Sequence, residues 1–205
     1  MALPLLKPEF DAAAFLDWDS TQTIKHEYID GEVFAMAGVQ LNHARAAGNL
    51  YLALRGHLGS TPCQTFMSDV KLRVEAANCY FYPDLFVTCS AADRANPMVQ
   101  REPMLIVEVL SPSTAAFDRG QKFAAYRQLP TLQEYVLIDT DARAADVYRR
   151  GADGLWVLHP FAKGETTRLA SVDLQITAAD LFAQVTDQPA PAPQVAAQPP
   201  TRPAP

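Results

Sequence analysis

The segment that most constrains the fold is Leu105–Leu110, in which Glu108 is the only polar side chain. So short an unbroken apolar run predicts a strand that is covered on both faces. Burying an unpaired charge is so costly that a carboxyl group placed there must become neutral or find a cation. Glu108 therefore needs a partner. A structural ion pair with an arginine is one alternative to a functional role.

A second carboxylate, Asp84, opens another apolar strand, Leu85–Val87, directly after Pro83. Because proline lacks a backbone donor and favours an extended entry, we expect Asp84 to lie where the strand meets the surface. A turn aspartate is the competing explanation, since Pro-Asp is a common turn pair. Two carboxylates at the ends of two buried strands, with a lysine following, suggest a site for a divalent metal.

That lysine, Lys122, lies on a predicted helix that Ser113 or Thr114 can cap and that runs to about Leu129. Its helical neighbours place it at the border of the apolar face that packs on the sheet. The side chain can therefore extend toward the strand ends. The alternative is a surface pair with Asp118 at i,i+4, which would contribute only about 0.3–0.5 kcal/mol.

The rest of the chain alternates strands and helices. Asp30-Gly31 predicts the turn of an early β-hairpin, and the apolar spacing from Leu41 to Leu58 predicts an amphipathic helix. Further strands are expected at 70–75, 80–88, 134–139, 144–149, 155–160 and 168–176, a polar loop at 90–102 and a closing helix at 178–185. The strand, helix and strand from Leu105 to Asp139 imply a parallel pair. The fold class is therefore α/β or α+β with a mixed sheet.

Length and composition favour one domain over residues 1–186. The 205 residues suffice for a single core, and the stretch 187–205 holds seven of the chain's 16 prolines and no aromatic residue. We therefore expect a disordered, proline-rich tail. With a net charge of −6, the chain as a whole does not attract nucleic acid electrostatically.

The three cysteines, Cys63, Cys79 and Cys89, are an odd number without a Cys-x-x-Cys pair, so we expect them to be reduced and mostly buried. The sequence shows no signal peptide and no run of about 18 apolar residues, which predicts a cytoplasmic protein.

Taken together, Asp84, Glu108 and Lys122 point to phosphodiester hydrolysis. Hard oxygen ligands favour Mg²⁺ or Mn²⁺, which would bridge the two carboxylates and a substrate phosphate. Such a metal lowers the pKa of a bound water, and a nearby lysine can orient that water or stabilise a developing oxyanion.

Two further side chains are weaker candidates. His43 stands at the start of the long helix, where a capping or core role is the more probable explanation. Glu27 precedes the hairpin turn and could supply a third carboxylate, although a cross-strand pair with Lys25 or Lys71 would explain it equally well.

These residues resemble a known pattern. Pro83-Asp84, Glu108-Val-Leu and a lysine at 122 on the following helix resemble the PD-(D/E)xK nuclease superfamily, in a variant in which Leu110 stands where the lysine is usual. Together with the motifs Glu27-Tyr-Ile-Asp-Gly-Glu-Val and Glu108-Val-Leu-Ser-Pro-Ser-Thr, the chain resembles the Uma-two family of restriction-endonuclease-like proteins.

The resemblance implies a restriction-endonuclease-like fold and a Mg²⁺-dependent endonuclease acting on DNA. Its catalytic residues would be Asp84, Glu108 and Lys122, with Glu27 as an accessory acid and the two strand carboxylates as metal ligands. The competing hypothesis is a nonhydrolytic nuclease-fold module that binds DNA or protein. A homodimer is expected, because cutting both strands of a duplex with one site per chain favours two-fold pairing. The strands after Asp139 are one candidate surface.

The tail is expected to be dispensable for folding, because 187–205 offers little apolar area to bury. A chain that ends at Thr186 should keep its melting temperature within a degree or two, on a scale of roughly 2–4 °C per kcal/mol. Calorimetry of both lengths measures this. A much larger fall would mean that the tail packs on the domain.

Overall fold

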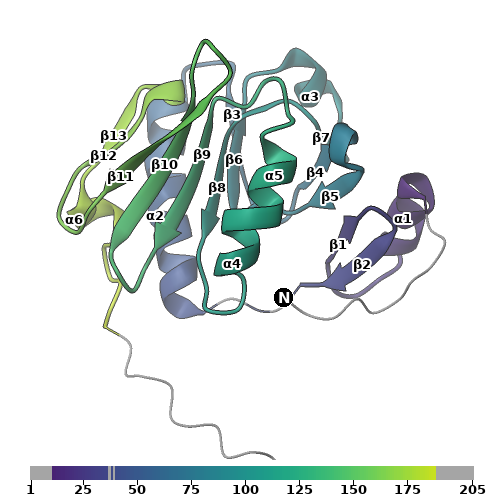
Figure 1. The fold of residues 1–205 in the computed structure, drawn as a ribbon, viewed down its shortest axis with the longest axis horizontal. Helices are drawn as coiled ribbons and strands as arrows, with labels where there is room; N and C mark the ends of the chain where they lie inside the picture. The colour runs from purple at the N-terminus through teal and green to yellow at the C-terminus, as the bar shows by residue number, and fades with distance from the viewer. Residues whose placement is uncertain (1–10, 37, 39, 188–205) are drawn as a thin grey trace, which may run out of the picture.

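The larger of two mixed sheets forms the centre of the computed structural model, which describes residues 11–36, 38 and 40–187 (Figure 1). Its strand order is β11-β10-β9-β8-β6-β3. The bounds are β3 Gln64–Met67, β6 Leu85–Thr88, β8 Pro103–Val109, β9 Glu134–Asp139, β10 Ala144–Arg150 and β11 Trp156–Phe161. Strands β8 and β9 run parallel, whereas the other neighbours in this sheet are antiparallel. The expected parallel pair is thus confirmed.

The central strands are apolar on both faces because both faces are covered. Val107 of β8 belongs to one core cluster, which includes Leu50 of the long helix α2, Leu41–Leu58. Ile106 belongs to the other, which includes Tyr126 of the short helix α5, Phe123–Tyr126. Figure 1 shows α2 behind the sheet and α5 in front of it. Alternation along a strand therefore sends every second side chain of β8 toward α5, and Glu108 is one of them.

The helical segment that carries Lys122 has three parts. Helix α4, Ala115–Phe117, continues into a π-helical turn, Asp118–Lys122, and then into α5. The segment begins where the sequence predicts but ends at Tyr126, earlier than expected. Thr114 is the N-cap residue, but its side chain makes no capping hydrogen bond. Single π-helical turns of this kind are frequent at functional sites.

The second sheet has the order β2-β1-β5-β4-β7. Its bounds are β1 His26–Ile29, β2 Glu32–Ala35, β4 Lys71–Val74, β5 Cys79–Phe81 and β7 Val99–Gln100. Helix α1, Ala12–Asp19, packs on it through Phe15, whose ring contacts those of Tyr28 and Tyr80. The predicted hairpin is confirmed as β1 and β2, with Asp30 and Gly31 both at positive φ.

Two predicted strands are wrong in their extent. The strand expected at 80–88 is divided into β5 and β6, which belong to different sheets. The break falls at Tyr82-Pro83-Asp84, because proline has no N–H to donate to a neighbouring strand. The backbone N–H of Ser68 donates to the carbonyl oxygens of Pro83 and Asp84 at this break. The strand expected at 168–176 is a small hairpin, β12 Thr167–Leu169 and β13 Leu174–Ile176.

Other boundaries also differ from expectation. The loop at 90–102 contains helix α3, Ala91–Ala95, and strand β7, while the closing helix α6 covers only Ala178–Leu181. Strand β4 carries one buried arginine. Arg73 is buried because its guanidinium stacks on the ring of Tyr80 and bonds Glu75 and Asn78.

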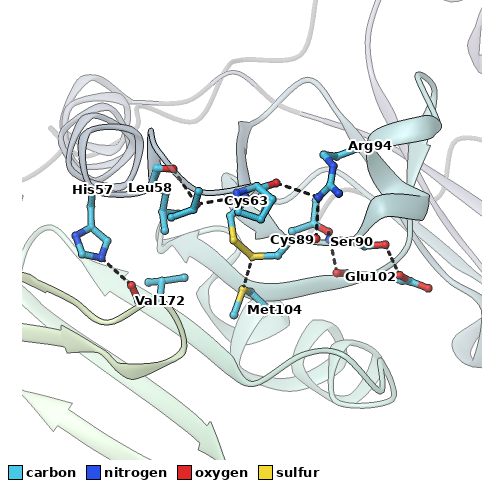
Figure 2. Close-up of a disulfide and its surroundings, with 12 residues drawn as sticks. His57, Leu58, Cys63, Cys89, Ser90, Arg94, Glu102, Met104 and Val172 are labelled. Carbon is cyan, nitrogen blue, oxygen red and sulfur yellow. Dashed lines mark hydrogen bonds between the residues drawn. A yellow bond between two sulfur atoms is a disulfide. The ribbon is translucent and has the colours of Figure 1, made fainter.

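The prediction of three reduced cysteines is wrong for two of them, Cys63 and Cys89. Cys63 and Cys89 form a disulfide that joins the start of β3 to the end of β6 (Figure 2). These positions flank paired strands, since Gln64 lies opposite Thr88. Their proximity depends on the antiparallel register and has no local sequence signature. Cys79 is free and buried, as expected.

The disordered tail and the homodimer stay predictions. The tail from residue 188 onward lies outside the described residues. The homodimer stays a prediction, although Leu155, Val157 and Leu158 expose large apolar side chains on or beside the edge strand β11. Within the described part of the chain, no helix combines the length and apolar character needed to cross a bilayer.

Packing in the central sheet generates a stability prediction. Ile106 is fully buried in β8, so Ile106→Ala should lower the free energy of unfolding by about 2–5 kcal/mol, through lost burial and the remaining cavity. Urea denaturation measures the change. Leu52→Ala is the control, because Leu52 is 70% exposed on α2 and its truncation should cost about 0.5 kcal/mol or less.

Candidate active site

The two predicted carboxylates meet because of strand register. Leu85 of β6 lies opposite Val107 of β8 in an antiparallel pair, so one further step places Asp84 opposite Glu108. Two hydrogen bonds fix this arrangement. Asp84 N donates to Glu108 Oε2 at 3.3 Å, and Val109 N donates to Asp84 Oδ2 at 2.7 Å. The structure thus brings together the two side chains that the sequence selects as metal ligands.

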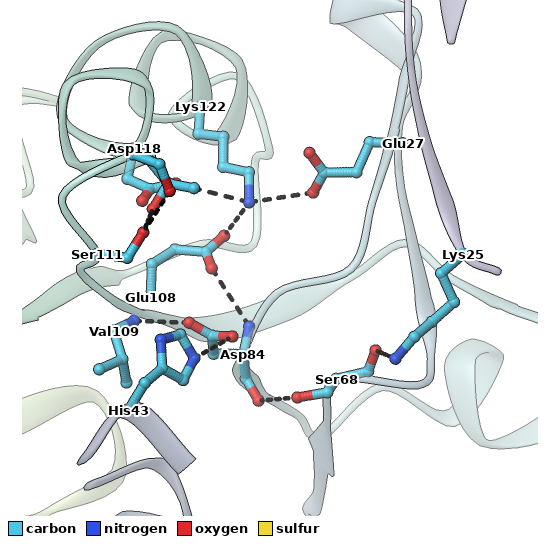
Figure 3. A network of polar contacts seen from close by, with 12 residues as sticks. Lys25, Glu27, His43, Ser68, Asp84, Glu108, Val109, Ser111, Asp118 and Lys122 are labelled. Carbon is cyan, nitrogen blue, oxygen red and sulfur yellow. Dashed lines mark hydrogen bonds and ion pairs between the residues drawn. The ribbon is translucent and has the colours of Figure 1, made fainter. Parts of the chain in front are cut away.

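Lys122 completes the predicted trio. Its Nζ lies 3.0 Å from Glu108 Oε1, 3.1 Å from Glu27 Oε1 and 3.6 Å from Asp118 Oδ1 (Figure 3). The lysine and Asp118 are both buried, so the alternative of an exposed i,i+4 pair is wrong. The alternative of an arginine partner for Glu108 is wrong as well, because its cation is this lysine.

Glu27 reaches the site from the other sheet. It lies on β1, its Oε1 contacts Lys122, and Tyr82 N approaches the same oxygen at 3.5 Å. The alternative cross-strand pairs are absent among the described residues, because Lys25 pairs with Asp69 and Lys71 pairs with Asp19. Glu27 is therefore placed beside the other three candidates.

Sequence reasoning underestimated His43 and missed Tyr126. His43 extends from the first turn of α2, and its Nε2 lies 2.9 Å from Asp84 Oδ1. The N-cap of that helix is Gln40, so the expected capping role of His43 is wrong. Tyr126 donates its hydroxyl to Glu108 Oε1 at 2.9 Å. Its spacing of four residues from Lys122 was the available signal, because it places both on one helix face.

The site carries more negative than positive charge. Four carboxyl groups, those of Glu27, Asp84, Glu108 and Asp118, surround the single ammonium of Lys122. Burial raises the pKa of Glu108 to about 8; Lys122 opposes this rise, and Asp84 adds to it. For Lys122, burial disfavours the charged form, but the surrounding carboxylates outweigh burial and raise its pKa well above the usual value. A second cation would relieve this imbalance.

A cavity of about 480 Å³ opens onto these groups. It is lined by Asp84, Glu108, Lys122 and Glu27, by His43, and by hydroxyl and apolar side chains from 111–117 and the hairpin. Paired carboxylates, a charged lysine and room for a ligand can bind a hard cation and a phosphate. The donor set therefore fits Mg²⁺ or Mn²⁺. Within the described residues, however, no three His, Cys, Asp or Glu side chains are grouped to hold a metal alone.

Titration of Glu108 should be visible in stability. Its pKa is raised from 4.5 to about 8, so between these values the folded protein keeps a proton that the unfolded chain releases. The contribution of Glu108 to the free energy of unfolding should therefore fall as pH rises from about 4.5 to about 8. Chemical denaturation at several pH values should show a steeper fall for wild type than for Glu108→Gln. Identical slopes would contradict the raised pKa.

Comparisons with known proteins relate the chain to a family. The Uma2 family model, described as "Putative restriction endonuclease", matches residues 12–179. Two uncharacterized proteins of Synechocystis sp. are similar. The protein slr1290 is 37% identical over 171 residues, covering 83% of this chain and 88% of the relative. The protein sll1609 is 38% identical over 149 residues, covering 72% of this chain and 84% of the relative.

The fold also matches a solved structure. A putative nuclease of the DUF820 group from Anabaena variabilis superposes with a TM-score of 0.73 at 16% identity, over 86% of this chain and 99% of that chain. At this identity the match supports the fold alone, which is restriction-endonuclease-like. Because the family model covers most of the chain and every carboxylate of the site lies within it, the chain belongs to the Uma2 family of putative restriction endonucleases.

Proposed function

We propose that this protein is a metal-dependent endonuclease that hydrolyses phosphodiester bonds in DNA. The observation that carries the proposal is the meeting of Asp84 and Glu108 across β6 and β8 with the ammonium of Lys122 at 3.0 Å from Glu108. Membership of a family described as putative restriction endonucleases supports the same reaction class.

In this proposal Asp84 and Glu108 hold a Mg²⁺ or Mn²⁺ ion. When bound, such an ion lowers the pKa of a water ligand and offsets negative charge at a phosphate. Mg²⁺ commonly takes one or two carboxylates and completes its shell with waters and substrate oxygens. The absence of a three-ligand group among the described residues is compatible with that mode.

The chain's own residues have separate tasks. Lys122 remains protonated because Glu108, Glu27 and Asp118 surround it, so it can orient a water or stabilise negative charge on a phosphate oxygen. Glu27 serves as the accessory acid by holding this ammonium from the opposite sheet. His43 contacts Asp84 Oδ1 and thereby fixes the orientation of that carboxylate.

A nonhydrolytic module is the second candidate. Two observations favour it: Leu110 stands at the position usual for the superfamily lysine, and Lys122 already neutralises part of the carboxylate cluster. Such a module would bind DNA or protein without needing a metal. Metal affinity therefore separates the two candidates.

Metal binding should stabilise the wild-type protein. Added Mn²⁺ should raise the free energy of unfolding by about 2.7 kcal/mol at a hundredfold excess over Kd. Glu108→Gln should reduce this response and abolish cleavage of supercoiled DNA, because it removes one ligand charge. Lys122→Met should keep the metal response and lose turnover. Thermal shift and gel assays measure both quantities.

The controls exclude trivial explanations. Glu108→Gln purified in parallel reports any contaminating nuclease. Asp141→Asn, which changes an exposed carboxylate outside the cavity, should leave both the Mn²⁺ response and cleavage unchanged. If wild type shows no Mn²⁺-dependent shift and Glu108→Gln unfolds the protein, Glu108 is a structural ion-pair partner and the nuclease proposal fails.

A further inference from the structure

The cavity is lined by charged side chains and also by apolar and aromatic ones. The carboxylates and Lys122 line it together with Ile29 and Phe34 from the β1–β2 hairpin and Phe117 from α4. Among its described residues, the lining contains three aromatic side chains, Phe34, Tyr82 and Phe117, of which Phe34 and Tyr82 are buried and Phe117 is partly buried.

The charged groups lie deep. The side chain of Asp84 is 14% exposed, that of Lys122 is 8% exposed and that of Glu108 is 4% exposed. A phosphate must enter the cavity to approach them. Duplex DNA is stiff, with a persistence length of about 150 base pairs, and its bases are stacked inside. A single strand bends freely and exposes its bases, so it can enter without the unstacking cost of a few kcal/mol.

The lining offers little to hold two phosphate backbones. Among its described residues, Lys122 is the only lysine, and there is no arginine. Lys122 is already engaged by three carboxylates, and the chain carries a net charge of −6. Affinity for duplex DNA depends largely on several lysines and arginines that neutralise phosphates. Aromatic side chains instead favour single strands, because unpaired bases stack on them.

We infer that the substrate of this site is single-stranded or locally unpaired DNA, one nucleotide of which enters the cavity with its base against Phe117, the aromatic residue of the described lining that is only partly buried. The cavity volume of about 480 Å³ lies within the range of about 300–1,000 Å³ that is typical of small-ligand sites. This inference rests on the proposed nuclease function and specifies its substrate class.

Binding tests the inference apart from catalysis. Fluorescence anisotropy with the wild-type protein, kept from cleaving by a chelator and no added metal, would compare a labelled single-stranded oligonucleotide, its blunt duplex, a duplex with an unpaired bulge, and the same strand as RNA. The single strand should bind about tenfold more tightly than the blunt duplex, with the bulged duplex between them. Equal or tighter binding of the blunt duplex would overturn the inference. Tighter binding of RNA would overturn the assignment to DNA.

Conservative variants test the aromatic contact. Phe117→Leu keeps an apolar side chain but removes a stacking surface, so it should weaken single-strand binding by about fivefold or more. Phe161→Leu is the matched control, because Phe161 is a partly buried aromatic residue of β11 outside the cavity. Melting temperatures confirm that each variant is folded. Unchanged binding in the folded Phe117→Leu protein would overturn the stacking contact.

Cleavage assays with wild type and Mn²⁺ separate the two proposals. Faster cleavage of the single strand and the bulge than of the blunt duplex supports both. Cleavage of the blunt duplex at an equal or greater rate overturns the substrate inference and leaves the nuclease function standing. If no DNA is cut but the single strand still binds preferentially, the nuclease proposal fails and the recognition inference holds.

Discussion

The buried ammonium of Lys122 is the interaction on which the site depends. It contacts Glu108 on the larger sheet, Glu27 on the smaller sheet and Asp118 one π-helical turn away. Removing one member of such a buried cluster leaves charge without compensation, which typically costs several kcal/mol. A single side chain therefore joins both sheets and the helix over one cavity, and it does so through charge in a region that is otherwise apolar.

The apolar core positions these charges. Leu105, Val107 and Val109 pack toward α2, so the intervening positions of β8 must face α5. On that face Ile106 packs in the second core cluster and Glu108 meets Lys122 and Tyr126. Hydrophobic burial on one face thus determines where a carboxylate points on the other. This arrangement stabilises the fold less than an apolar residue could, which is consistent with a functional role for Glu108.

The sequence was informative where a single residue broke a strong pattern. Glu108 interrupts an apolar run, so its need for a partner could be inferred, and Asp84 and Lys122 followed from position. The contact between Glu27 and Lys122 was not local information, because Glu27 lies on another sheet. His43 and the disulfide between Cys63 and Cys89 depend on how distant segments pack. The division of 80–88 was signalled by Pro83 alone, and the apolar and aromatic residues on either side of it outweighed that signal in the sequence analysis.

The register between β6 and β8 has an evolutionary consequence. Side chains alternate with a period of two, so inserting or deleting one residue between Leu85 and Val87, or between Leu105 and Val107, would turn Asp84 or Glu108 toward the α2 core. Length variation in this part of the chain should therefore be confined to the connection 89–102. In homologues that keep the site, substitutions can accumulate along both strands, whereas gaps in an alignment should fall only in that connection.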